Sequence, residues 1–146
     1  LYLLQPNVKE GAGGLRDYHA AYWAMQASGA FARDRVELMH QGLLTDDELA
    51  DLSAALDFLW RVRNELHLRA GRKNDQLSFE IQESMAAAFG YPARDDDHDL
   101  PVERFMGEYY RHARIIRTCS DLVFEQCLAR VRKAPARRKA PTRSDA

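Results

Sequence analysis

The chain has 146 residues, of which 46% are hydrophobic and 29% are charged, and its formal net charge is −1. This length and composition suit a single globular domain that buries its own core. No apolar run reaches the ~20 residues of a membrane helix, and no signal-peptide pattern precedes the first motif. We therefore expect a cytoplasmic protein with no membrane partner.

The charge is unevenly distributed along the chain. Residues 130–146 carry seven basic side chains and one acidic one, whereas residues 1–129 carry 14 basic and 21 acidic ones. An acidic folded part is a poor candidate for nucleic-acid binding, so no nucleic-acid partner is expected. The Pro-, Ala- and cation-rich end predicts a disordered linker over residues 132–146, after a helical domain over residues 1–131. Because residue 1 is Leu rather than Met, we expect a piece of a longer protein.

The first motif is QPNVKEGAGGLRD at residues 5–17, where Gly11, Gly13 and Gly14 lie between Lys9 and Arg16. Glycine is used where the backbone needs a positive φ or must approach another group closely. One interpretation is a purely structural turn that begins a helix. The other is a loop whose backbone N–H groups and two cations bind an anion. The spacing matches neither the dinucleotide GxGxxG pattern nor the P-loop pattern.

Helical patterns follow this loop in order. The spacing of apolar residues predicts a helix over residues 15–28 and a short one over residues 31–41. A long amphipathic helix then begins at a capping box formed by Thr45 and Glu48 and ends near Gly71.

Two more helices complete the pattern. We expect a fourth helix to end at Gly90, an acidic loop over residues 94–99, and a long fifth helix that begins at Pro101 and runs to residue 131. The prediction is an all-α bundle of about five helices, with the two long helices as its spine. Cys119 and Cys127 lie eight positions apart on the fifth helix, too far for a disulfide, and are expected to be buried thiols. The residues expected on the buried face of the fifth helix are Phe105, Tyr109, His112, Ile116, Cys119, Val123 and Cys127.

A second polar cluster lies in RNELHLRAGRKND at residues 63–75. Arg63 falls on the leucine stripe of the long helix, where an unpaired cation would be unfavourable, so it should pair with a carboxylate or line a wet cleft. A structural ion pair between helices and a ligand contact remain equally open. A single histidine such as His67 is more often a hydrogen-bonded core residue than a base. Since no nucleophile–His–acid triad or metal-ligand cluster is evident, we assign no catalytic residue and no metal ligand here.

Three blocks in order resemble one family. PNVKEGAGGLRDYHAAYW is similar to the stretch that follows the catalytic core in bacterial PII uridylyltransferase/uridylyl-removing enzymes. RNELHLRAGRKNDQLSFEIQ resembles that family's R-x-x-L-H…G-R-x-x-D-x-L-x-x-x-x-Q run, and VERFMGEYYR resembles its VE-x-FM-x-x-YYR run. The resemblance covers roughly residues 5–125.

The resemblance implies a domain that shares its polypeptide with a nucleotidyltransferase domain and an HD phosphohydrolase domain. The whole enzyme would transfer UMP from UTP to a tyrosine of the PII signalling protein in nitrogen regulation. Its Mg²⁺ would be bound by the catalytic domain, so we expect the isolated chain to be inactive. The residues expected to line the nucleotide phosphates are Lys9, Gly11, Gly13, Gly14, Arg16 and Arg72. The residues expected in orienting or structural roles are Asp17, through an ion pair with Arg16, and Arg63, His67 and Asp75.

Two alternatives remain at this point. The helical surface could dock PII or couple neighbouring domains without touching nucleotide. The chain could also be the equivalent domain of a glutamine-synthetase adenylyltransferase, which carries a similar K-x-G-x-G-G-[IL]-R-D/E stretch.

Overall fold

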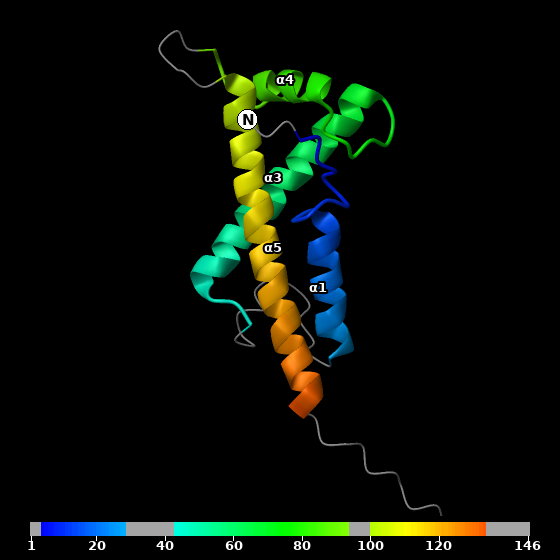
Figure 1. The fold of residues 1–146 in the computed structure, drawn as a ribbon, viewed down its shortest axis with the longest axis vertical. Coiled ribbons are helices and arrows are strands. Elements are labelled where there is room, and N and C mark those ends of the chain that lie inside the picture. The colour runs from blue at the N-terminus through cyan, green and yellow to red at the C-terminus, as the bar shows by residue number, and fades with distance from the viewer. Residues whose placement is uncertain (1–3, 29–42, 94–99, 134–146) are drawn as a thin grey trace, which may run out of the picture.

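The computed structural model describes residues 4–28, 43–93 and 100–133, and the regular structure in these ranges is helical (Figure 1). The helices are α1 (Leu15–Ala27), α3 (Asp46–Ala70), α4 (Phe79–Ala88) and α5 (Pro101–Lys133). The all-α prediction is confirmed for these ranges, which contain four helices, and the predicted number of about five stays a prediction. The helix predicted over residues 31–41 and the loop predicted over residues 94–99 lie outside the described residues.

The two long helices form the spine, as predicted. α5 has 33 residues and α3 has 25, and the two cross along the length of the molecule. α5 also contacts α1 on one side and α4 near its N-terminal end, so every other described helix packs against it. α5 continues to Lys133, which places residues 132 and 133 in the helix and not in the predicted tail. The rest of that tail lies outside the described residues.

The apolar stripe of α5 provides one side of the core. Because side chains three and four positions apart share a helix face, a run with this spacing buries one continuous surface. Full burial of one such large apolar side chain contributes about 1.5–3 kcal/mol. All seven residues predicted for this face are buried: Phe105, Tyr109, His112, Ile116, Cys119, Val123 and Cys127. Both cysteines are free.

Local signals set the helix ends. The Thr45 side chain accepts the Glu48 N–H at 3.2 Å, and the Glu48 carboxylate accepts the Thr45 N–H at 3.0 Å, which is the predicted capping box. α3 ends at Gly71, whose φ of 59° closes the helix in the left-handed conformation. Gly90, with a φ of 78°, lies just beyond α4. These three boundaries match the sequence prediction.

The core is aromatic where α3, α4 and α5 meet. The rings of Phe58, Phe89 and Phe105 lie 5.4–6.2 Å apart between centroids, a range typical of favourable tilted packing. His112 stacks on Phe58 at 4.4 Å, and burial lowers the pKa of its imidazole. α1 closes the other end of the core with Leu15 and Met25, both fully buried.

Candidate functional site

The N-terminal segment pairs with the chain that follows α3. Val8 donates its N–H to the Asp75 carbonyl oxygen at 2.8 Å, and Leu77 donates to the Pro6 carbonyl at 2.9 Å, around an antiparallel bridge between Asn7 and Gln76. Figure 1 shows this segment beside the C-terminal end of α3. The pairing joins the two polar motifs, which are about 60 positions apart in the sequence.

The loop that follows is packed too closely for side chains. Gly13 has a φ of 71°, and a Cβ built on it would lie 2.0 Å from the Ala113 carbonyl oxygen of α5. A Cβ on Gly14 would lie 2.8 Å from three carbonyl oxygens of the loop itself. Glycine is therefore required here by close approach, which supports the structural interpretation of these residues.

The N–H groups of the three glycines have partners inside the loop. Gly11 donates to the Asn7 carbonyl at 2.9 Å, and Gly14 donates to the Gly11 carbonyl at 2.8 Å. Gly13 donates to the Asp17 carboxylate at 2.7 Å. Asp17 thus fixes the loop on the first turn of α1. These backbone amides are therefore engaged within the loop and do not point a free N–H at a ligand.

Lys9 and Arg16, which carry the two cations of the motif, are joined through their backbones. The Arg16 backbone N–H donates to the Lys9 carbonyl at 2.8 Å, so the helix start and the preceding turn are held together. Lys9 is half-buried and Arg16 is exposed. The Arg16 guanidinium pairs with Glu10 at 3.0 Å, in contrast to the expected pair with Asp17. The Asp17 carboxylate instead accepts a hydrogen bond from the Gly13 N–H.

The Arg63 prediction is confirmed, and its partner is Asp75. The Arg63 Nε donates to Asp75 Oδ1 at 2.8 Å, and the His67 Nε2 lies 3.0 Å from the same oxygen. Burial raises the pKa of the Asp75 carboxyl, but the hydrogen bonds from Arg63 and His67 outweigh it and hold that pKa below its usual value. Asp75 is therefore an ionised group that ties α3 to the chain after it. Arg72 is exposed in the turn between them.

A polar hollow of about 330 Å³ lies between the glycine loop and α5. Its α5 side was not singled out from the sequence, since Arg117, Asp121 and Phe124 lie beside the predicted buried face and Ser120 was not included in it. Ser120 is buried there and its hydroxyl has no hydrogen-bond partner among the described residues. The residues lining this hollow are Glu10, Gly11, Ala12, Asp17, Ala20, Ala21, Arg117, Ser120, Asp121 and Phe124.

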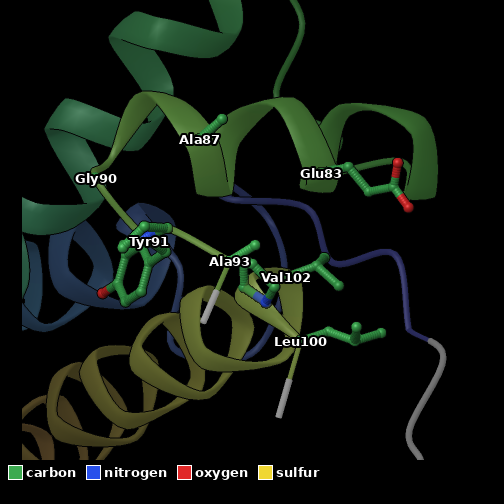
Figure 2. A pocket seen from close by; sticks show the side chains of 9 residues that line it. Glu83, Ala87, Gly90, Tyr91, Ala93, Leu100 and Val102 are labelled. Carbon is green, nitrogen blue, oxygen red and sulfur yellow. The ribbon is translucent and has the colours of Figure 1, made fainter. Parts of the chain in front are cut away.

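A larger hollow, of about 580 Å³, lies at the opposite end of α5 and is apolar. Figure 2 shows Glu83 and Ala87 of α4 above it, with Leu100 and Val102 below. None of the predicted site residues lines it. Among the described residues that line it, Glu83 is the charged one, and none of them is a cation.

The described residues contain no group of three or more His, Cys, Asp or Glu side chains that could hold a metal ion. No helix among them is long and apolar enough to span a bilayer. The site that remains is the glycine loop of residues 7–17 on the surface of a helical domain. It carries the cations Lys9 and Arg16 beside the acids Glu10 and Asp17, and because of the two cations it is called the cationic loop below.

This arrangement defines the chain as a helical domain that presents a glycine-rich loop with two cations. Comparison with known proteins identifies the family of this domain. A family model described as GlnD PII-uridylyltransferase matches residues 1–124. The chain belongs to this family. The match favours the uridylyltransferase over the adenylyltransferase alternative.

The relatives share one name, bifunctional uridylyltransferase/uridylyl-removing enzyme. The protein from Stutzerimonas stutzeri (strain A1501) is 46% identical over 84% of this chain and 13% of its own length. That from Pseudomonas aeruginosa (strain LESB58) is 42% identical over 85% of this chain and 13% of its own. That from Bradyrhizobium diazoefficiens is 35% identical over 99% of this chain and 17% of its own. The chain thus spans about a seventh of the length of these relatives. No solved structure matches it significantly.

Proposed function

We propose that this chain is the helical domain that completes the nucleotide site of a PII uridylyltransferase. In this proposal Lys9 and Arg16 contact the triphosphate of UTP, which a nucleotidyltransferase domain of the same polypeptide binds. The full-length protein, in the cytoplasm, then transfers UMP to a tyrosine of the PII signalling protein. Family membership supports the reaction, and the geometry of the glycine loop supports the role of this domain.

The single observation that carries the proposal is the close packing of the loop that holds the two cations. The Lys9 carbonyl accepts the Arg16 N–H at 2.8 Å, so the two residues keep a fixed spacing at the start of α1. Phosphoryl-group transfer depends on positioning and on neutralising the charge of the phosphates. An arginine can bind two phosphate oxygens at once. A rigid loop with an exposed arginine and a half-buried lysine meets both needs.

The other residues that were expected to line the phosphates also have a role in this proposal. Gly11, Gly13 and Gly14 let the loop pack, because their N–H groups are engaged within it. Arg72 extends the cationic surface from the turn beside Asp75.

In this proposal the catalytic domain, and not this chain, binds the Mg²⁺ of the reaction. The described residues do not fit a metal ion, since they provide no cluster of suitable ligands. Carboxylates of the catalytic domain would hold the metal ion, which would supply the polarisation of the phosphate that is attacked. The isolated chain is accordingly expected to have no transferase activity.

The experiment is to substitute Lys9→Ala and Arg16→Ala separately in the full-length enzyme and to measure uridylylation of PII. We expect each variant to lose about tenfold or more of kcat/KM for UTP while its melting temperature stays unchanged, because a lost charge-assisted phosphate contact costs about 1.5–3 kcal/mol. Lys73→Ala, an exposed lysine beyond the loop, is the matched control. Wild-type activity in both loop variants would refute the proposal.

A second candidate function is docking of PII on the surface of α1 and α5. Phe124, Leu128 and Val131 are exposed along α5, beside a small apolar hollow formed with Ala24 and Ala27 of α1. Exposed apolar patches of this kind often mark protein-binding surfaces. Titration of labelled PII with this chain tests it. Saturable binding that Phe124→Ser weakens supports docking, and no binding counts against it.

A further inference from the structure

His67 forms a histidine–carboxylate pair that the phosphate-binding role of the loop does not use. Its Nε2 lies 3.0 Å from Asp75 Oδ1, and the Arg63 Nε donates to the same oxygen at 2.8 Å. The Asp75 side chain is only 12% exposed, whereas that of His67 is 31% exposed. A buried carboxylate therefore holds a histidine that solvent can reach.

This contact selects the tautomer of the imidazole. An ionised carboxylate only accepts hydrogen bonds, so the proton of neutral His67 lies on Nε2 and the lone pair on Nδ1. Among the described residues, none forms a hydrogen bond with Nδ1. Nδ1 is also not among the buried polar atoms that lack a partner. A ring nitrogen with a free lone pair is thus presented at the surface, which is the arrangement of a general base held by a carboxylate.

Asp75 also connects this imidazole to the cationic loop. Its backbone carbonyl accepts the Val8 N–H at 2.8 Å, and Lys9 is the next residue. One residue therefore orients His67 through its side chain and positions the loop through its backbone. Figure 1 shows the end of α3 and the N-terminal segment side by side at this place.

We propose that His67, oriented by Asp75, accepts the proton of the hydroxyl group that receives the nucleotidyl group. This inference rests on the proposed function. The acceptor O–H bond breaks and its proton moves to His67 Nδ1. The acceptor oxygen forms a bond to the α-phosphorus of the nucleoside triphosphate, and the bond from that phosphorus to the bridging oxygen breaks, so that pyrophosphate leaves. A phenolic hydroxyl has a pKa near ~10 and stays protonated at neutral pH, so a nearby base accelerates its attack.

A structural role for the same histidine makes a different prediction, and glutamine separates the two. The side-chain amide of Gln can donate to Asp75 as Nε2 does, but it has no basic nitrogen. His67→Gln therefore keeps a hydrogen bond between α3 and Asp75 but removes the basic ring nitrogen that could accept a proton.

The experiment measures kcat and KM for uridylyl transfer by the full-length enzyme carrying His67→Gln or His67→Ala. We expect His67→Gln to lower kcat about 100-fold or more, in the range for loss of a general base, with KM for UTP changed less than about threefold. Free imidazole should restore part of the activity of His67→Ala, because it can occupy the vacated place. His19→Gln, in which a histidine stacked beside Trp23 on α1 is replaced, is the matched control and should keep kcat within about twofold.

Two results would overturn the inference. A kcat of His67→Gln within about threefold of wild type shows that the basic nitrogen is dispensable. A large loss in His67→Gln without imidazole rescue of His67→Ala assigns His67 a positioning role only. Either result leaves the proposed function standing if the Lys9 and Arg16 variants are impaired, whereas wild-type activity in those two variants rejects the proposed function first.

Discussion

Gly13 lies directly against the backbone carbonyl of Ala113, at the contact between the glycine loop and α5. A Cβ on Gly13 would come within 2.0 Å of that oxygen, and the φ of 71° already disfavours other residues. The contact fixes the position of the cationic loop along α5. The same two elements enclose the polar hollow that contains Ser120.

Gly13→Ala should destabilise the domain by about 3 kcal/mol or more, since the clash is with backbone and cannot be relieved by a side-chain rotation. Urea unfolding of the purified chain, followed by circular dichroism, measures the change. Gly107→Ala is the matched control. Gly107 lies in α5 with no atom within 4 Å of an added Cβ, so alanine there should stabilise the helix by about 0.5–1 kcal/mol. Equal stability of the two variants would contradict the contact.

Asp75→Asn should lower stability at neutral pH by about 2 kcal/mol, because Arg63 and His67 lose a charged acceptor. The pKa of Asp75 is held below its usual value in the folded state, so its contribution is present above the unfolded-state pKa and is lost as the pH falls through the folded-state pKa. The stability difference between wild type and variant should therefore shrink as the pH falls through the ordinary aspartate value of about 4 and on toward the lower folded-state pKa.

Denaturant unfolding at several pH values tests this dependence. Asp57→Asn, which replaces an exposed carboxylate of α3, serves as the control and should show no such convergence. A stability difference that stays constant down to the acid limit would show that the carboxylate charge is not what stabilises this junction.

Thr45→Ala should destabilise the domain by about 1 kcal/mol, since it removes the acceptor for the Glu48 N–H at the start of α3. Thermal unfolding measures the loss. Thr118→Ala, at an exposed position inside α5, removes a similar hydroxyl without a cap and should not destabilise. If both substitutions have the same effect, the capping box contributes nothing.

Glu10→Gln should leave stability within about 0.5 kcal/mol of wild type, because the Arg16–Glu10 pair is more than half exposed on both sides and such pairs contribute little. Arg16→Ala should likewise leave stability nearly unchanged. A loss of activity in this variant would therefore report on function and not on folding. Differential scanning calorimetry of both variants provides the measurement. A loss above about 1.5 kcal/mol in either would mean that the pair is structural.

Much of the fold could be predicted because its signals are local. The capping box at Thr45, the left-handed Gly71 and Gly90, and the apolar stripe of α5 each depend on residues within a few turns of one another. The predicted boundaries and buried face agree with the structure for this reason. The need of Arg63 for a carboxylate also followed from its place on an apolar stripe.

The candidate site could be predicted only in its residue types. That Arg16 pairs with Glu10 and not with the adjacent Asp17 depends on the turn geometry, in which Asp17 accepts the Gly13 N–H. The sequence places Arg117, Ser120, Asp121 and Phe124 on one face of α5, but it could not show that this face lines a hollow, because its partners are in the glycine loop, about 100 positions away in the sequence.

The sequence by itself determined the four described helices, the ends marked by Thr45, Gly71 and Gly90, the buried face of α5 and the family, since spacing and motif order are properties of the chain. The tertiary structure decided which of several carboxylates meets Arg63, that Val8 pairs with Asp75, and that Gly13 touches Ala113. These contacts join residues far apart in sequence, and their geometry depends on how whole helices pack. No local pattern encodes that packing, because many arrangements of the same amphipathic helices bury the same apolar faces.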